Sequence, residues 1–238
     1  MNLAIIDTET IRWSSEINGG FDNLQAFGLT LLSIGIPQSD GTLDYALFSP
    51  YASLPQFPTF DFNFISREQA TSALERAERI VSFNGDNFDF SILQSAKFKV
   101  ENWRHKSFDL LTIFVRAAGH RISLDNLATS QFQESKSFDS SKRAVEFWRS
   151  GLELLRGWSG SSNLDQTTSN QFCRQTAKHL FQTVIDYCKQ DVLITFQLYQ
   201  HLLQHKQLSY YDQRADRGRT LDLSDLVDRH ITDTVSTD

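Results

Sequence analysis

Short hydrophobic runs separated by polar turns dominate the first third of the chain. Four of these runs are rich in β-branched and aromatic residues and predict strands: Leu3–Ile6, Phe27–Ile36, Leu43–Phe48 and Ile80–Phe83. Between the third and the fourth run, Ser66 is followed three residues later by Gln69, a capping-box pattern that predicts a helix over 67–77. The order of these elements predicts an α/β fold, with an antiparallel meander and then a helical crossover to a parallel fourth strand.

Helical spacing of apolar positions dominates the rest of the chain. Helices are expected over 88–96, over 110–118, after the N-cap Ser123, over 142–155 and over 171–205. The polar, Gly- and Ser-rich stretch 157–170 predicts a surface loop or insertion. Residues 212–238 are weakly amphipathic and are expected to be peripheral.

Composition and charge exclude several classes of protein. With 40% hydrophobic residues and 22% charged residues in 238, the chain has an ordinary globular composition. A formal net charge of −6 excludes a uniformly basic nucleic-acid coat, although it allows a local basic strip or a site neutralised by metal ions. The acidic start MNLAIIDTET is unlike a signal peptide, no apolar run is long enough to span a membrane, and the two cysteines show no metal spacing, so we expect a cytoplasmic protein.

The first candidate site element is the pair Asp7 and Glu9 at the end of the first predicted strand. Residues i and i+2 of a strand face the same side, roughly 6.6–6.8 Å apart along the chain. Two carboxylates that project together repel each other unless a cation lies between them. The pair therefore predicts a divalent-metal site, with a solvated strand end as the alternative.

Two further elements carry acidic residues at places where a site is expected. The segment NGDNFD, residues 84–89, joins the fourth strand to a helix and brings Asp89 into the first helical turn. On the long C-terminal helix, Tyr187 and Asp191 are four residues apart and share one face. That face lies beside an apolar stripe expected to pack in the core, formed by Ile185, Cys188, Val192, Phe196 and Tyr199. Taken singly, each has a plain structural explanation, as a helix cap or as a half-buried aromatic residue.

Together the three elements resemble the DEDD family of 3′–5′ exonucleases in its Tyr-containing subgroup. The family's three motifs match, in order, Asp7 and Glu9; Asn84, Phe88 and Asp89; and Tyr187 and Asp191. The resemblance is strongest to the proofreading exonuclease domain of family B DNA polymerases. It implies an RNase H-like mixed five-stranded sheet flanked by helices, formed by residues 1–205, with 157–170 as a surface insertion and 206–238 as a C-terminal extension.

The resemblance also implies a role for each acidic residue. Asp7 is expected to bridge two Mg²⁺ or Mn²⁺ ions, Glu9 and Asp191 to hold the ion that binds the attacking water, and Asp89 to act on the second ion. Tyr187 is expected to orient the water.

The implied substrate is a nucleic acid, a single-stranded 3′ end of DNA or RNA, which Thr8, Asn84 and Phe88 would contact. The released products would be nucleoside 5′-monophosphates. The sequence identifies no protein partner.

Two groups of residues are candidates for holding that substrate. Residues 97–121 carry six basic side chains that either follow a phosphate backbone or form a solvated face: Lys97, Lys99, Arg104, Lys106, Arg116 and Arg121. Trp13, Phe21 and Phe27 either stack on a terminal base or pack in the core. Asp109 either supports the site or caps the helix that begins at Leu110.

Two other functions fit parts of the pattern. A non-catalytic nucleic-acid or protein-binding module on the same scaffold would need no metal pocket, which the four carboxylates argue against. A dehalogenase-type phosphatase would use the segment DTET, residues 7–10, but Glu9 stands where that chemistry needs Asp.

Overall fold

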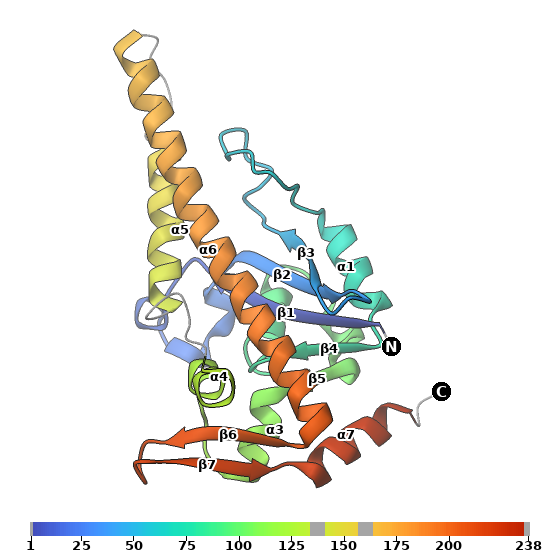
Figure 1. Cartoon of the computed structure of the whole chain (residues 1–238). Coiled ribbons are helices and arrows are strands. Elements are labelled where there is room, and N and C mark those ends of the chain that lie inside the picture. The colour runs from blue at the N-terminus through green and yellow to red at the C-terminus, as the bar shows by residue number, and fades with distance from the viewer. Residues whose placement is uncertain (1, 134–140, 157–163, 236–238) are drawn as a thin grey trace.

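The computed structural model describes residues 2–133, 141–156 and 164–235 and is centred on a five-stranded sheet with the spatial order β3-β2-β1-β4-β5 (Figure 1). The strands are β1 (Leu3–Thr10), β2 (Leu29–Pro37), β3 (Leu43–Phe48), β4 (Arg79–Ser82) and β5 (Ser107–Asp109). β1, β2 and β3 form an antiparallel meander, whereas β1, β4 and β5 are parallel. The predicted α/β architecture with a mixed five-stranded sheet is therefore confirmed.

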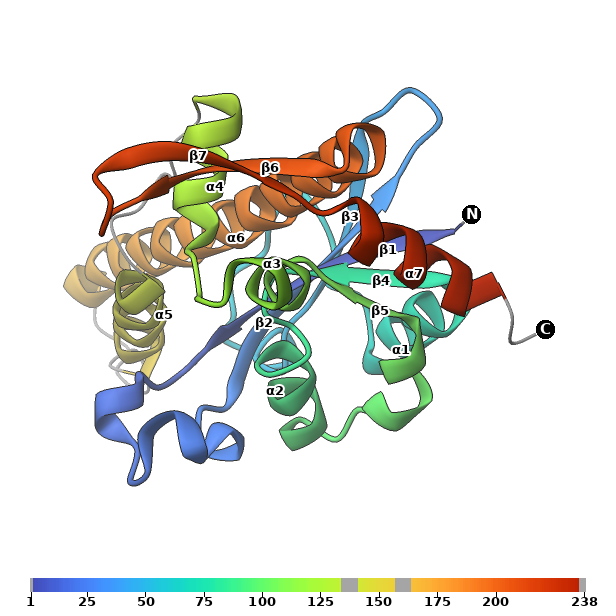
Figure 2. The same ribbon diagram turned by 90° about the horizontal axis from the view of Figure 1, so that it is seen from below.

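Helices cover both faces of this sheet. They are α1 (Arg67–Arg76), α2 (Asp89–Ser95), α3 (Leu110–Ala118), α4 (Leu124–Phe132), α5 (Ser141–Arg156), α6 (Leu164–His205) and α7 (Ser224–Val235). α6 crosses one face, and α1 and α2 lie on the opposite face (Figures 1 and 2). The predicted capping box forms at α1, where the Gln69 amide N–H donates to Ser66 Oγ and Gln69 Oε1 accepts from the Ser66 amide. No helix in the described ranges combines the length and hydrophobicity needed to cross a bilayer.

The alternation of side chains along β1 decides which residues face α6. Ile5 belongs to the core cluster that includes the buried face of α6, whereas Ala4 and Ile6 pack with α1 and α2. Because strand side chains alternate, Asp7 and Glu9 lie on the same side as Ile5. The strand runs to Thr10, beyond the predicted end at Ile6, so both acidic residues lie within β1 and are fixed by its pairing with β2.

A stripe of buried side chains packs α6 against the sheet. The predicted stripe is confirmed by low exposure at Ile185, Cys188, Val192, Phe196 and Tyr199. A side chain at Gly35 of β2 would come within 2.6 Å of Val192 Cγ1, so the helix approaches the strand more closely than any larger residue would allow. This close approach brings the neighbouring Asp191 against the sheet.

The expectation of a loop over 157–170 is wrong for residues 164–170. α6 begins at Leu164, so residues 164–170 are helical, and residues 157–163 lie outside the described part of the chain. Ser and Thr residues in this stretch suggested a break, but these residues are tolerated in a helix of this length once its C-terminal part is packed.

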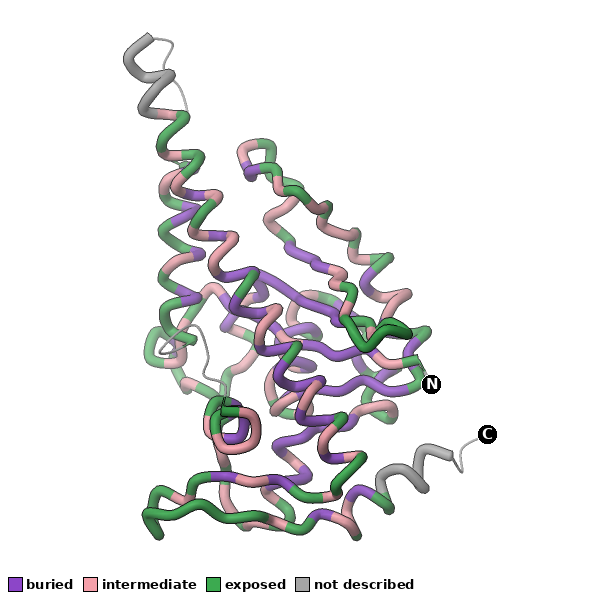
Figure 3. Tube along the Cα trace, viewed as in Figure 1, coloured by how far each residue is buried: buried purple, intermediate pink, exposed green. Residues whose placement is uncertain are grey.

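The segment after α6 forms a second, two-stranded sheet, β6 (Gln207–Asp212) and β7 (Arg217–Asp222), followed by α7. The hairpin lies beside α3 and α4 (Figure 2). Its Leu208 and Tyr210 are buried, as are Leu223 and Val227, and all four share a core cluster with Phe108 of β5. The expectation that residues 212–238 are peripheral is therefore wrong at Leu223 and Val227, which are buried in the main core, whereas residues 213–220 are exposed (Figure 3).

Candidate active site

All the residues proposed from the sequence as catalytic or substrate-contacting line one pocket of about 350 Å³. They are Asp7, Thr8, Glu9, Asn84, Phe88, Asp89, Tyr187 and Asp191. Because these residues come from β1, from the β4–α2 connection and from α6, the fold joins segments far apart in sequence at one place.

Asp7 and Glu9 form the tightest cluster in the pocket, together with Cys188. One ligand atom from each of the three side chains lies within 4.8 Å of the other two. The Cys188 thiol donates to Asp7 Oδ2 at 3.2 Å. Burial, followed by the charges of Asp7 and Glu9, raises the pKa of this thiol well above its usual value, so Cys188 remains a protonated donor. The helical spacing of Cys188 predicts only a core residue, and no local sequence pattern shows that it faces β1.

Tyr187 precedes Cys188 on α6 and is almost fully buried beside the same acidic residues. Burial raises the pKa of its hydroxyl, and the charges of Asp191, Glu9 and Asp7 act in the same direction, while a hydrogen bond with Ser141 opposes them. The phenol is therefore protonated at neutral pH and can donate a hydrogen bond into the pocket. Ser141, at the start of α5, is a pocket residue that the sequence analysis missed.

Asp89 begins α2 and approaches β1 on the side that faces away from α6. The Thr8 hydroxyl donates to Asp89 Oδ1 at 2.6 Å, and both side chains are buried. Burial raises the pKa of Asp89 to about 7; the Thr8 hydrogen bond lowers it, and the nearby charge of Asp109 raises it. Thr8 thus positions Asp89 in this structure, and the contact of Thr8 with substrate stays a prediction.

The β4–α2 connection is fixed by the carboxylate of Asp109. Asp109 Oδ1 accepts from the Asn84 amide at 2.8 Å and Oδ2 from the Asp86 amide at 3.1 Å, while Oδ1 also caps α3 through the Leu111 amide at 2.9 Å. The helix-cap interpretation of Asp109 is therefore confirmed, and its carboxylate also holds the connection that carries Asp89. Burial raises the pKa of this carboxyl, and its amide partners oppose the shift.

Gly85 allows this connection to lie close to β4. A Cβ at position 85 would be 2.2 Å from Ser82 Oγ, and it would also come 3.4 Å from Asp89 Oδ2. The preceding residue, Asn84, adopts a left-handed conformation with φ of 72°, which Asn tolerates better than most residues. Asn84 and Gly85 therefore allow the turn to pack closely beneath Asp89.

Aromatic side chains form one wall of the pocket. Phe27 is buried, stacks on Phe21 with ring centroids 5.5 Å apart and meets Phe88 edge to face at 5.6 Å. Phe21 remains 59% exposed, and Trp13 is half-buried in the same wall. Phe27 is therefore a core residue, as one of the two interpretations had it, while Phe21 presents an open ring face beside the acidic cluster.

Arg121 is the one residue of the predicted basic strip that lines this pocket. Its guanidinium donates to Asn84 Oδ1 at 2.9 Å. Elsewhere in the strip, Arg104 donates to the Asp86 carbonyl and Lys106 to the Glu75 carbonyl, while Lys97, Lys99 and Arg116 are exposed. Arg104 and Lys106 thus hold nearby backbone, and contact of the exposed members of the strip with a phosphate backbone stays a prediction.

The donor set of the pocket fits a divalent cation. Asp7 and Glu9 bring two carboxylates together at a partly buried place, and Asp191 and Asp89 line the same cavity. Mg²⁺ and Mn²⁺ prefer carboxylate oxygens, and a bound cation relieves the repulsion between adjacent carboxylates. Such an ion would be held by the carboxylate oxygens, since Mg²⁺ and Mn²⁺ prefer oxygen ligands to a thiol sulfur.

Comparison with known proteins agrees with this fold. A family model for the RNase H superfamily matches residues 46–203, more than half of the chain, a range that includes Asp89 and Asp191 and begins after β1. The structure is similar to that of the family B DNA polymerase from the hyperthermophilic archaeon Pyrobaculum calidifontis, with a TM-score of 0.50 and 14% identity. The alignment covers 85% of this chain and 24% of the polymerase, so the chain spans about a quarter of that protein's length. No curated protein matches the chain.

Proposed function

Because the chain belongs to the RNase H superfamily, we propose that it is a metal-dependent 3′–5′ exonuclease of the Tyr-containing DEDD type. Its substrates would be single-stranded ends of DNA or RNA, and its products nucleoside 5′-monophosphates. The observation that carries the proposal is the convergence of Asp7, Glu9, Asp89, Tyr187 and Asp191 on one pocket.

In this proposal the acidic residues hold two Mg²⁺ or Mn²⁺ ions. Asp7 would bind both ions, Glu9 and Asp191 would bind one of them, and Asp89 would act on the other. Such ions, when bound, supply positive charge to the scissile phosphate and lower the pKa of bound water. The charge of a phosphodiester would otherwise be repelled by this acidic pocket, so nuclease activity requires the cations.

The chemical step is a hydrolysis. The oxygen of a water molecule forms a bond to phosphorus, the bond from phosphorus to the 3′-oxygen breaks, the water loses a proton to solvent, and the leaving oxygen gains one. Tyr187 keeps its proton, so its hydroxyl would hold the attacking water by a hydrogen bond and would not act as a base. Thr8 keeps Asp89 in place for this step.

The shape of the pocket supports a single-stranded end as substrate. A cavity of about 350 Å³ is too small to enclose a base pair with its two backbones, whereas one terminal nucleotide could enter it. Phe21 would stack on the terminal base, and stacking tolerates any base identity. Asn84 and Phe88, which also line the cavity, would contact the same nucleotide.

The test is degradation of a 5′-labelled single-stranded oligonucleotide in the presence of Mn²⁺. We expect a ladder of products shortened from the 3′ end with the unchanged protein and a loss of at least about 100-fold with Asp191→Asn, since removing a metal ligand removes charge stabilisation from the transition state. Asp186→Asn is the matched control, because Asp186 is an exposed acid on the same helix and lies outside the pocket. Equal activity in all three proteins would assign the degradation to a contaminant and refute the proposal.

Calorimetry with Mn²⁺ separates this enzyme from a non-catalytic binding module. The exonuclease is expected to bind the cation, and Asp7→Asn is expected to abolish that binding. A protein that binds oligonucleotides but no Mn²⁺ would be the binding module instead. A dehalogenase-type phosphatase has no support from the family match, which is to the RNase H superfamily.

A further inference from the structure

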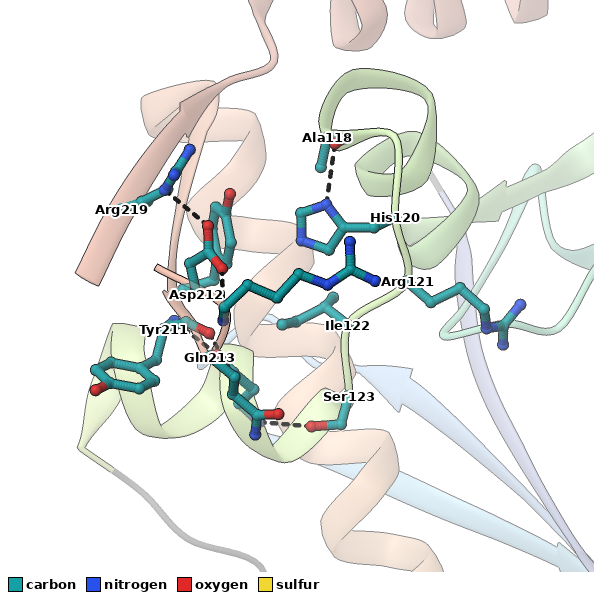
Figure 4. A pocket seen from close by; sticks show the side chains of 12 residues that line it. Ala118, His120, Arg121, Ile122, Ser123, Tyr211, Asp212, Gln213 and Arg219 are labelled. Carbon is teal, nitrogen blue, oxygen red and sulfur yellow. Dashed lines mark hydrogen bonds and ion pairs between the residues drawn. The ribbon is translucent and has the colours of Figure 1, made fainter. Parts of the chain in front are cut away.

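A second, larger pocket lies between the β6–β7 hairpin and the segment that joins α3 to α4 (Figure 4). Its volume is about 750 Å³, roughly twice that of the candidate active site. The hairpin contributes Tyr211, Asp212, Arg214 and Arg219, and the α3–α4 segment contributes His120 and Arg121. Neither the family match nor the proposed chemistry at the acidic cluster gives this pocket a role.

The charges that line this pocket favour an anion. Two arginines, Arg214 and Arg219, lie with one carboxylate, Asp212, on the hairpin side of the pocket, and Arg121 adds a positive charge at its boundary with the active site, in a chain whose overall charge is −6. Asp212 already accepts hydrogen bonds from the backbone amides of Arg214 and Ala215, at 3.0 and 3.1 Å, and forms an ion pair with Arg219 at 2.9 Å. The Asp212 carboxylate therefore stabilises the turn of the hairpin and orients Arg219.

Arg214 is the most available of these cations. It is exposed, and no described residue forms an ion pair with its guanidinium or accepts a hydrogen bond from it. A guanidinium presents several N–H groups in a plane, which suits phosphate oxygens. The Arg214 guanidinium is thus available to donate hydrogen bonds to a phosphate, and it is carried on a turn that Asp212 stabilises.

The second pocket borders the candidate active site. Arg121, Ile122 and Ser123 line both cavities. The Arg121 side chain leaves its loop on the side away from the hairpin (Figure 4) and reaches Asn84 in the active-site pocket. One short loop therefore forms the boundary between the acidic cluster and the arginines of the hairpin.

We infer that the hairpin pocket binds the phosphate backbone of the substrate strand on the 5′ side of the scissile bond. This inference rests on the proposed function, since it takes the 3′ end to lie at Asp7 and Glu9. A strand that extends from that end past Arg121 enters a cavity with two further arginines.

The inference is tested by comparing a trinucleotide with a dodecanucleotide, both single-stranded oligothymidylates with a 5′ fluorophore. Binding is measured by fluorescence anisotropy with Ca²⁺ in place of Mn²⁺ and with the active-site carboxylates unchanged, so that a divalent cation is bound while the strand is consumed slowly. Arg214→Glu is expected to weaken binding of the dodecanucleotide about three- to tenfold and to leave the trinucleotide unchanged, because only the longer strand reaches the hairpin. The salt dependence of dodecanucleotide binding should also fall, by about 0.7 in the slope of log K against log salt concentration for each phosphate that the variant no longer neutralises.

Arg217→Glu is the matched control, because Arg217 is exposed on the same hairpin and lines neither pocket. It makes the same change in net charge and is expected to alter dodecanucleotide binding by less than about twofold. Equal effects of the two substitutions, an equal loss of trinucleotide binding, or no effect of Arg214→Glu would each overturn the inference. No effect of Arg214→Glu is the result expected if the pocket binds an acidic protein instead. Absence of cleavage by the unchanged protein would instead refute the exonuclease proposal, while the binding measurement would still report on the hairpin.

Discussion

At the scale of single residues, Asp89 carries a strongly perturbed carboxyl group in the candidate active site. Its pKa is raised from 3.8 to about 7, chiefly because the side chain is buried. In the unfolded chain the ordinary pKa returns. A carboxyl group whose pKa is higher in the folded state stabilises the fold fully below its unfolded pKa, and this contribution is lost as pH rises through the folded pKa. The metal-free protein is therefore expected to lose stability between about pH 4 and about pH 7.

We predict that Asp89→Asn makes the metal-free protein more stable at about pH 8, by roughly 2–4 kcal/mol, with no gain near pH 4. An amide cannot ionise, and its oxygen can still accept the hydrogen bond from Thr8. Urea unfolding in the presence of EDTA at several pH values measures the difference. Asp186→Asn, at an exposed position, should show none. Equal stability of Asp89→Asn and the unchanged protein at pH 8 would show that burial does not raise the pKa of Asp89.

The two cysteines should differ sharply in reactivity. Cys188 is buried and its pKa is raised, whereas Cys173 is only half-buried. Because the thiolate is the reactive form, a disulfide reagent should modify about one thiol in the native protein and both in urea. Cys173→Ser should leave no thiol that reacts rapidly before unfolding. Rapid modification of that variant would mean that the thiol beside Asp7 is open to solvent.

The sequence predicts the acidic residues of the site more readily than their partners. The i, i+2 spacing of Asp7 and Glu9 and the i, i+4 spacing of Tyr187 and Asp191 are local patterns, so they can be recognised without a structure. The thiol contact from Cys188 to Asp7 joins residues 181 positions apart and depends on how closely α6 approaches β1. Such a contact is a property of packing, which no local spacing encodes.

At the scale of elements, the β4–α2 connection depends on a glycine. We predict that Gly85→Ala destabilises the protein by about 1–3 kcal/mol, because the added methyl group would overlap Ser82 and displace the turn that carries Asp89. Gly218→Ala should be nearly neutral, since nothing lies within 4 Å of a Cβ at that position. Thermal unfolding of both variants measures the contrast. Equal melting temperatures would show that the turn has room to adjust.

Elements with a strong periodic pattern were predicted well, and short or charged ones were not. The three strands of the meander and the C-terminal helix follow from their apolar spacing. β5 is missed because three residues are too few for a period to appear. In β6, Leu208 and Tyr210 do alternate with polar residues, but the many charged residues that follow them favour a peripheral interpretation.

At the scale of the whole molecule, the hairpin and the sheet share one hydrophobic core. Leu208 and Tyr210 lie in the same cluster as Phe108 of β5 and Val192 of α6. The Tyr210 ring meets Phe114 of α3 edge to face, with centroids 5.1 Å apart. The residues after α6 therefore help to hold the helices that frame the candidate active site, and the arginines of the second pocket are carried on a packed element.

This shared core leads to a prediction about cooperativity. Leu208→Ala removes a fully buried side chain and should destabilise the protein by about 2–5 kcal/mol. Because the cluster extends from the hairpin to β5 and α6, the substitution should lower the midpoint of a single transition, seen alike by circular dichroism and by tryptophan fluorescence. Thr220→Ala, at an exposed position on the same hairpin, should change stability by less than about 0.5 kcal/mol. If the hairpin were instead an independent appendage, Leu208→Ala would leave the main transition in place and only loosen residues 207–222, which hydrogen exchange of that segment would reveal.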